Sequence, residues 1–201
     1  MSELVTLRPL NLEQIRLKIV GDSELIVHAW SEKAKKEMLA AQQKKKVPKE
    51  IRDPEKEFKA CFYVIDPKKE IYGFPALAIN VAIIEAAHKN IGIEKTMVKK
   101  AIRILGNHHI KGMHLLQIHG SKGEMREDMV RIGMGSADLR YRPMFFPWSM
   151  EFDVRYDADL VSAETVVNLI NRAGFGVGLG EWRPEKKGVS GTFHVEAQSL
   201  A

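Results

Sequence analysis

The stretch that most constrains this chain is a run of four glycines at alternate positions 174, 176, 178 and 180, followed by Glu-Trp-Arg-Pro. Glycine loses more conformational freedom on folding than any other residue, so this density implies positive φ or a close backbone approach. Before the run, residues 162–173 space their apolar side chains as in an amphipathic helix, with Ser162 as N-cap. After it, residues 192–196 have the pattern of a strand. The glycines therefore connect a helix to a strand.

This order excludes a dinucleotide-binding loop. Such a loop follows a strand and opens a helix, so that the phosphate meets the positive N-terminal end of the helix. Here the glycines follow the C-terminal end of a helix, where the partial charge is negative. Two interpretations stay open. The bare backbone lets a nucleic-acid strand or a neighbouring subunit approach, or the glycines let the loop pack on its own sheet.

Length and composition are those of one ordinary globular domain. The chain has 201 residues, 45% of them hydrophobic and 28% charged. Its single cysteine, Cys61, lies in an apolar run, so no disulfide forms within the chain, as expected in a reducing cytosol. No signal peptide or membrane span is recognisable. We expect a cytoplasmic protein without membrane contact, located in the host cytoplasm if phage-encoded.

The positive charge is concentrated in one segment. The net charge is +5, and residues 31–52 hold eight basic side chains and three acidic ones, a surplus of 8 − 3 = 5. The basic residues are Lys33, Lys35, Lys36, Lys44, Lys45, Lys46, Lys49 and Arg52. A clustered surplus of this kind is typical of a surface that binds a polyanion. The alternative is a solvated helix face followed by a mobile loop.

The periodicity predicts an α+β fold with a large insertion. The core elements are strands at 15–20 (extending toward 28), 58–65, 148–156 and 192–196, with helices at 31–43 and 162–173. This is the βαββαβ order of a ferredoxin-like fold. We predict one domain, residues 1–201, with core segments 11–68 and 147–197. The insertion, 69–146, contains helices within 76–100, a hairpin at 101–119 and an arm at 120–146.

The arm has an unusual composition. It contains four glycines, four methionines and the arginines Arg126, Arg131, Arg140 and Arg142, whose charge is nearly balanced by acidic residues. Structureless loops of this length are uncommon in compact domains unless they are functional. We therefore predict a protruding hairpin or an ordered arm. Arginine and methionine are both enriched where protein surfaces meet, and arginine also suits phosphate.

The strand and helix order, together with the glycine loop at 174–180 and the segment 188–193, resembles the RAMP superfamily. That superfamily contains CRISPR RNA-binding backbone subunits and guide-processing endoribonucleases, and the arm looks like the thumb hairpin of the backbone subunits. The chain is also similar to phage- and prophage-encoded proteins, a group that carries no established activity. That similarity lies in Leu25 to His28, Phe146 to Ser149 and the Gly-Leu-Gly-Glu-Trp-Arg-Pro segment at 178–184.

The leading hypothesis is a non-catalytic protein that binds RNA or single-stranded DNA and assembles into an oligomer or filament along it. The glycines Gly176, Gly178 and Gly180 would let the strand approach, and Trp182 or Trp30 would stack on a base. The alternatives are a Trp182 packed over the sheet and an Arg183 paired with a neighbouring glutamate. The expected phosphate contacts come from Lys33, Lys36, Lys44, Lys45, Lys46, Arg126, Arg131, Arg140, Arg142, Arg183, Lys186 and Lys187.

Two other functions remain open. His28 ends the first apolar segment. In the RAMP superfamily, which the chain resembles, guide-processing ribonucleases often have a histidine in this region. The resemblance therefore makes His28 a candidate general base in a metal-independent endoribonuclease. The alternative for His28 is a packed, hydrogen-bonded side chain. The other function is a protein-interaction module that acts on a host defence complex. We expect no cofactor and no metal: His108, His109, His114 and His119 are close in sequence, but no cysteine is near them and the predicted hairpin divides the group.

Overall fold

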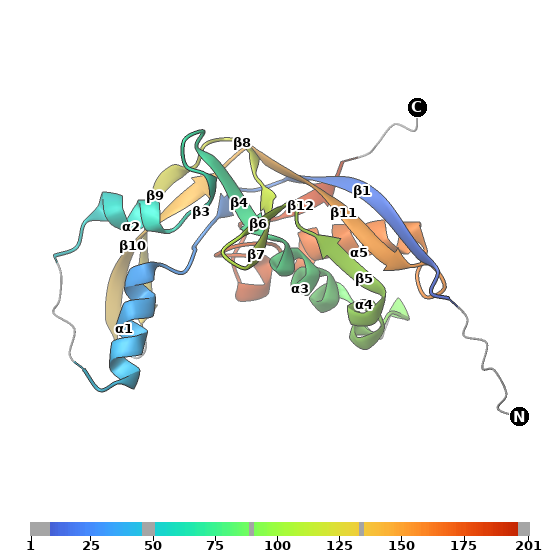
Figure 1. Ribbon diagram of the computed structural model, residues 1–201, viewed down its shortest axis with the longest axis horizontal. Coiled ribbons are helices and arrows are strands. Elements are labelled where there is room, and N and C mark those ends of the chain that lie inside the picture. Colours follow the sequence, from blue (N-terminus) through green and yellow to red (C-terminus); the bar gives the residue numbers. More distant parts are fainter. Residues whose placement is uncertain (1–8, 46–50, 89–90, 133–134, 197–201) are drawn as a thin grey trace, which may run out of the picture.

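The computed structural model describes residues 9–45, 51–88, 91–132 and 135–196, which form an arch with two unequal legs (Figure 1). The larger leg is built on an antiparallel sheet with the strand order β12-β1-β11-β5. The strands of this main sheet are β1 (Leu12–Gly21), β5 (Ile102–Leu105), β11 (Trp148–Asp157) and β12 (Phe193–Val195), and the short β8 (His119–Gly120) pairs with the start of β11. The fold is thus α+β, as the sequence predicts.

Strand β11 and helix α5 (Ala163–Gly176) form the centre of the core, and both confirm the sequence prediction. The inward side chains of β11 alternate from Trp148 to Tyr156, and all of them are buried. The Ser162 side chain accepts a hydrogen bond from the Thr165 amide and so caps α5. The helix buries Val166, Leu169, Ile170 and Ala173. Each large apolar side chain buried here contributes about 1.5–3 kcal/mol relative to exposure.

The prediction that residues 58–65 supply the second core strand is wrong. Asp53 accepts a hydrogen bond from the Lys56 amide and Pro54 occupies the first turn, so helix α2 (Pro54–Ala60) forms instead. The strand that follows, β3 (Tyr63–Asp66), belongs to a separate sheet with the order β3-β4-β7-β6. Its other strands are β4 (Ile71–Pro75), β6 (His108–Ile110) and β7 (Met113–Gln117).

The place beside β11 is taken by β5, which lies within the segment 69–146 that the sequence suggested as an insertion. The hairpin predicted at 101–119 is therefore only partly correct, since β6 and β7 form a hairpin within this range but β5 takes no part in it. Residues 102–105 pair with β11, whereas β7 pairs with β4 and β6. Ile102 and Ile104 are buried in the main core, and strand β11 offers them a longer apolar partner than a local hairpin does.

Helices α3 (Ala76–Ala86) and α4 (Lys95–Ala101) form where the sequence predicts helices, and they lead into β5. Helix α3 buries only part of its apolar surface. Ile79 and Ile83 are buried, whereas Leu77 and Val81 are 70% and 48% exposed. Because α3 is apolar on nearly all sides, periodicity alone did not determine which stripe faces the core.

The smaller leg holds α1 (Glu32–Gln42), α2 and the predicted arm (Figure 1). The arm is an antiparallel hairpin of β9 (Glu124–Ile132) and β10 (Ser136–Phe145), with β2 (Leu25–Ile26) paired to the end of β10. Ser31 caps α1 as predicted, but α1 buries no residue and does not cover the main sheet. Even its apolar Met38 is 49% exposed. The helix instead carries its lysines on a separate leg.

Candidate functional site

The glycine loop begins at the end of α5 and is fastened to the turn between β1 and β2. The Glu181 amide donates to the Ile26 carbonyl oxygen at 2.9 Å, and the Gly191 amide donates to the Glu24 carbonyl oxygen at 2.7 Å. Within the loop, the Leu179 amide donates to the Gly191 carbonyl oxygen at 2.9 Å. A short 3₁₀ turn, η2 (Pro184–Lys186), follows. These bonds hold the loop rigidly against the chain's own backbone.

This packing explains two of the three glycines that the sequence suggested as nucleic-acid contacts. Gly178 and Gly180 have φ values of +71° and +72°, and an added Cβ atom on either would meet neighbouring atoms at 2.7 Å and 2.3 Å. Gly176 has no atom within 4 Å of such a Cβ and no positive φ. Packing of the loop on its own chain is therefore sufficient reason for glycine at 178 and 180.

The loop brings Glu181 beside His28. The His28 Nδ1 and Glu181 Oε1 atoms are 3.5 Å apart, and the two side chains are 33% and 42% exposed. The pKa of Glu181 is lowered, chiefly by its hydrogen bond with His28; burial opposes this shift, and the charges of Arg142 and Arg140 add smaller effects that lower the pKa further. The Glu181 carboxylate is therefore ionised at neutral pH. The sequence pointed to His28 but missed Glu181 as its partner, because 153 positions separate them (181 − 28).

An exposed tryptophan lies close in the chain to each member of this contact. Trp30 is two residues after His28 and is 58% exposed, and Trp182 directly follows Glu181 and is 43% exposed. Trp182 also has a φ of +54°, which is unusual for a bulky residue. Its carbonyl oxygen accepts a hydrogen bond from the Ser190 amide at 3.0 Å, which helps to hold this backbone. Trp182 does not form a buried lid over the sheet.

A cavity of about 370 Å³ opens between the glycine loop and the exposed stripe of α3. Its polar residues include His28, Tyr63, Glu181 and Arg183. Arg183 donates to the Gly180 carbonyl oxygen at 2.9 Å and forms an ion pair with Glu185 at 2.7 Å. That pairing matches one of the two alternatives that the sequence left open for Arg183.

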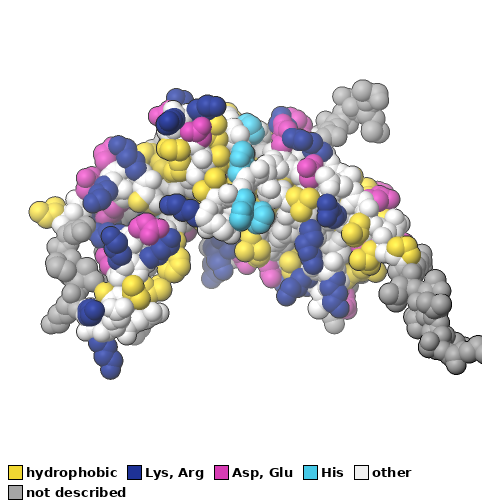
Figure 2. Space-filling view, in the orientation of Figure 1, with side chains coloured by type: hydrophobic (Ala, Val, Ile, Leu, Met, Phe, Trp, Pro, Cys, Tyr) yellow, Lys and Arg dark blue, Asp and Glu magenta, His cyan; other side chains and the backbone are white. Residues whose placement is uncertain are grey.

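Those of the expected phosphate-contacting lysines that the structure describes are all exposed. Lys33 and Lys36 lie on α1, Lys44 and Lys45 lie just beyond its end, and Lys46 lies outside the described residues. Lys186 and Lys187 lie at η2, close in sequence to Trp182. Figure 2 shows Lys and Arg side chains on both legs of the arch, beside the hollow between them.

The arginines of the arm are mostly engaged with carboxylates of the same hairpin. Arg126 contacts Asp128 at 2.9 Å, Arg140 contacts Asp138 at 3.5 Å, and Arg142 contacts Asp128 at 3.5 Å. The Arg142 side chain is only 3% exposed, so it does not reach solvent. Arg131 is exposed on β9, opposite Ala137. The structure thus gives Arg142 a structural role in the hairpin and leaves Arg131 accessible to a ligand.

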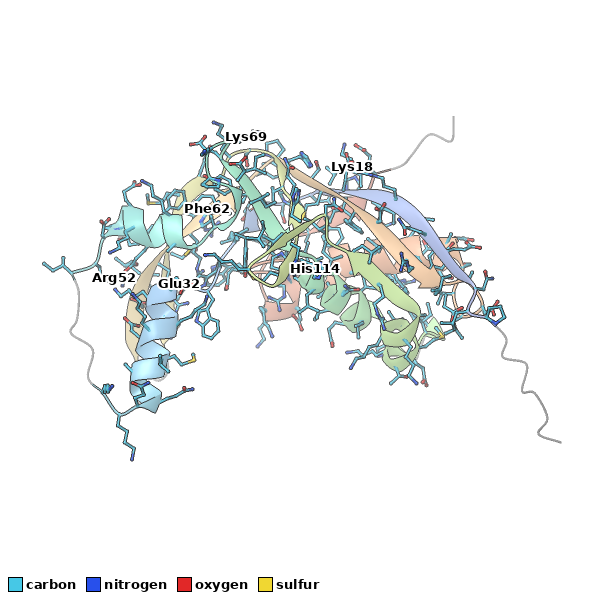
Figure 3. All side chains as sticks on the ribbon, in the orientation of Figure 1. Lys18, Glu32, Arg52, Phe62, Lys69 and His114 are labelled. Carbon is cyan, nitrogen blue, oxygen red and sulfur yellow. The ribbon has the colours of Figure 1, made fainter. Side chains whose placement is uncertain are left out.

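Figure 3 shows how the labelled Arg52 lies beside the hairpin at the start of α2. Its guanidinium binds Glu57 at 2.6 Å and Asp138 at 2.5 Å, and it donates to the Leu139 carbonyl oxygen at 2.5 Å. These bonds raise the pKa of Arg52, with the hydrogen bond to Glu57 contributing most. The last basic residue of the charged segment therefore fastens α2 to the arm.

His108 and His109 lie on β6, and His114 lies on β7. His109 and His114 face each other with ring centroids 4.7 Å apart, and Figure 3 labels His114 near the middle of the arch. Within residues 9–45, 51–88, 91–132 and 135–196, no group of three or more His, Cys, Asp or Glu side chains is placed to hold a metal ion. In the same ranges, no helix combines the length and apolar character needed to cross a membrane.

The chain matches no protein-family model and no curated protein. Function is accordingly inferred from the geometry of its own residues.

Proposed function

We propose that this protein binds single-stranded nucleic acid, RNA or DNA, beside the glycine loop. The observation that carries the proposal is the presence of two exposed tryptophans, Trp30 and Trp182, each within two residues of the 3.5 Å contact between His28 and Glu181. Because Trp30 is two residues from His28 and Trp182 is next to Glu181, the Cα atom of each tryptophan lies within roughly 7 Å of the Cα atom of His28 or Glu181. Exposed aromatic rings stack on bases of any sequence, at about 1–3 kcal/mol per base.

The charges around the tryptophans suit a phosphate backbone. Lys186 and Lys187 are exposed on η2, and Lys33 and Lys36 are exposed on the first turns of α1, just after Trp30. A base stacked on either tryptophan therefore has lysines close to its flanking phosphates. A stacking platform surrounded by lysines is the usual construction of a site for single strands.

The main sheet supports a ferredoxin-like core, in a form that differs from the sequence prediction. Numbered along the chain, its strands are β1, β5, β11 and β12, and their order β12-β1-β11-β5 reads 4-1-3-2. Helices α3 and α4 precede the second of these strands, and α5 joins the third to the fourth. We propose that this is the βαββαβ arrangement, with β5 in the place that residues 58–65 were expected to take. This fold alone does not define a function.

The smaller leg supports assembly of several copies along the strand. Helix α1 buries no residue and exposes Met38 and Leu39, which are 49% and 54% accessible. On the arm, Met129 is 69% exposed and Leu139 is 41% exposed. Exposed apolar side chains on two neighbouring elements are typical of a surface that another protein molecule covers.

The proposal is tested by fluorescence anisotropy with mixed-sequence RNA and single-stranded DNA over a series of salt concentrations. We expect binding that weakens linearly in log–log form as salt rises, since phosphate neutralisation releases counterions. Sedimentation with and without the strand reports assembly. A protein that binds neither nucleic acid at low salt, or binds with no salt dependence, overturns the proposal.

A second function is favoured by the same contact. A histidine whose Nδ1 faces an ionised carboxylate is held in one orientation by that contact. His28 is thus a candidate general base for the 2′-hydroxyl of RNA. Incubation of labelled RNA in EDTA with the native protein and with His28→Ala separates the two functions. If the native protein cleaves the RNA and His28→Ala does not, the ribonuclease function is supported. If the RNA stays intact with both proteins, the ribonuclease function is excluded.

A further inference from the structure

The cavity beside the glycine loop has the size and walls of a site for one flat ring system. Its volume, about 370 Å³, falls within the roughly 300–1,000 Å³ of small-ligand sites. Apolar walls come from α3, from β4 and from the loop: Leu77, Val81, Phe74, Pro75, Val177 and Leu179. Leu77 and Val81 are otherwise exposed apolar side chains, at 70% and 48%, so a bound ring would cover them.

One edge of the cavity carries a carboxylate with two oxygens and no proton. Glu181 lines the cavity, and its contact with His28 through Oε1 leaves acceptor capacity on both oxygens. His28 and Tyr63 line the same cavity and provide donors beside this acceptor. The polar edge therefore offers two adjacent acceptor positions next to a donor.

We propose that this cavity binds a guanine base. Guanine is the base whose pairing edge presents two adjacent donors, N1–H and the 2-amino group, next to an acceptor, O6. Adenine and cytosine each present one amino donor beside a ring-nitrogen acceptor, which the carboxylate repels. Uracil presents one N–H between two carbonyl oxygens. The Glu181 carboxylate thus pairs in a bidentate manner with guanine alone.

The guanine can come from two sources. When it belongs to a single strand, the inference rests on the proposed function, and the base enters the cavity while its neighbours stack on Trp30 or Trp182. When it belongs to a free guanine nucleotide, the cavity works without a strand. Lys186 and Lys187 are exposed at η2, directly after the cavity residue Glu185 in the chain, and are available to phosphates in both cases.

The test uses the full chain and a set of labelled oligouridines, each with G, A, C or inosine at the centre. We expect the G oligomer to bind about 10-fold or more tightly than the A oligomer, the discrimination typical of a bidentate pair. Inosine lacks the 2-amino group and falls between them. Glu181→Gln removes the preference for G, because its amide no longer offers two acceptors.

Two further variants keep the test independent of folding defects. Glu185→Gln, also at the cavity, retains the preference because Glu185 is paired with Arg183. Val81→Phe fills the cavity from a position that is already 48% exposed, so the fold tolerates it, and it abolishes the preference. Thermal unfolding of each variant is measured alongside.

Calorimetry with guanosine monophosphate, with adenosine monophosphate as control, distinguishes the outcomes. A G preference in the oligomers that Glu181→Gln removes supports the inference. Equal binding of all the oligomers, without selective binding of the guanine nucleotide, overturns it and leaves the proposed function standing. If the protein binds guanosine monophosphate but none of the oligomers, the inference that the cavity binds guanine is supported and the proposed function is overturned. Binding of neither overturns both.

Discussion

Gly180 lies directly against the backbone of Ile26: a Cβ atom on residue 180 would be 2.3 Å from the Ile26 carbonyl oxygen. The next residue, Glu181, donates its amide to that same oxygen at 2.9 Å. The contact joins the glycine loop to the segment that carries His28 and Trp30. It therefore determines whether the two halves of the proposed site meet.

Replacing Gly180 by alanine should separate this contact from the general effect of losing a glycine. Gly180→Ala combines a positive φ with a backbone clash, and we expect a loss of about 2–5 kcal/mol in the free energy of unfolding. Gly176→Ala is the control, since its added Cβ meets nothing within 4 Å, and it should be neutral or slightly stabilising. Urea unfolding measures both. Equal effects would show that Gly180 is not held against Ile26.

Stacking on the tryptophans predicts a loss of affinity when either ring is removed. We expect Trp30→Ala and Trp182→Ala each to weaken single-strand binding about 5- to 100-fold. The matched control is Phe175→Ala, which removes a ring that is 84% exposed and lines a different hollow, with Ile91 and Ile93. Anisotropy at constant salt provides the affinities. Binding that is lost with Phe175→Ala but kept without both tryptophans would place the strand elsewhere.

The lysines at η2 should act through phosphate alone. Replacing Lys186 and Lys187 by glutamine is expected to lower the slope of log affinity against log salt by about 0.7–1 per lysine. Lys69→Gln is the control, because Figure 3 shows Lys69 at the top of the arch, away from the hollow between the legs. An unchanged slope in the double variant would remove Lys186 and Lys187 from the interface.

The buried pair inside the arm predicts a strong effect on stability. Asp128 and Arg142 have side chains only 8% and 3% exposed, and their charged atoms are 3.5 Å apart. Asp128→Asn leaves the Arg142 charge buried without this partner, at a cost of about 3–5 kcal/mol. Glu70→Gln breaks the exposed pair with Lys122 and should change the free energy of unfolding little. Similar small effects of both variants would show that solvent reaches Arg142.

The lowered pKa of Glu181 predicts a dependence of stability on acid. A carboxyl whose pKa is lower in the folded chain stabilises the fold above its unfolded value, near 4.5, and this stability is lost as the pH falls through the folded pKa. We therefore expect the difference in unfolding free energy between the native protein and Glu181→Gln to shrink below pH 4.5. Thermal melts from neutral to acid pH measure it. A difference that does not change with pH would mean that His28 does not hold the carboxylate.

Local sequence signals were sufficient for α5, β11 and the arm. Helical and strand periodicities in residues 148–173 identify which side chains are buried, because each element buries one face whatever it packs against. Ser31 and Ser162 mark helix starts through a hydrogen bond to an amide three residues later, which is equally local. The alternating glycines likewise indicate a loop under tight backbone constraint, and the φ values at 178 and 180 confirm it.

The choice of neighbours belongs to the tertiary structure. Residues 58–65 and 102–105 are both apolar enough for the edge of the main sheet, and only the packing of α3, α4 and β11 places the second of them there. The candidate site depends on the same kind of choice, since His28 and Glu181 meet through the loop anchored at Ile26. Periodicity indicates which face of a helix or strand is buried, whereas contacts between residues far apart in the chain select the neighbouring element against which it packs. Local patterns in the sequence were therefore enough to locate most helices and strands, and the long-range contacts of the folded chain selected which of their side chains share a site.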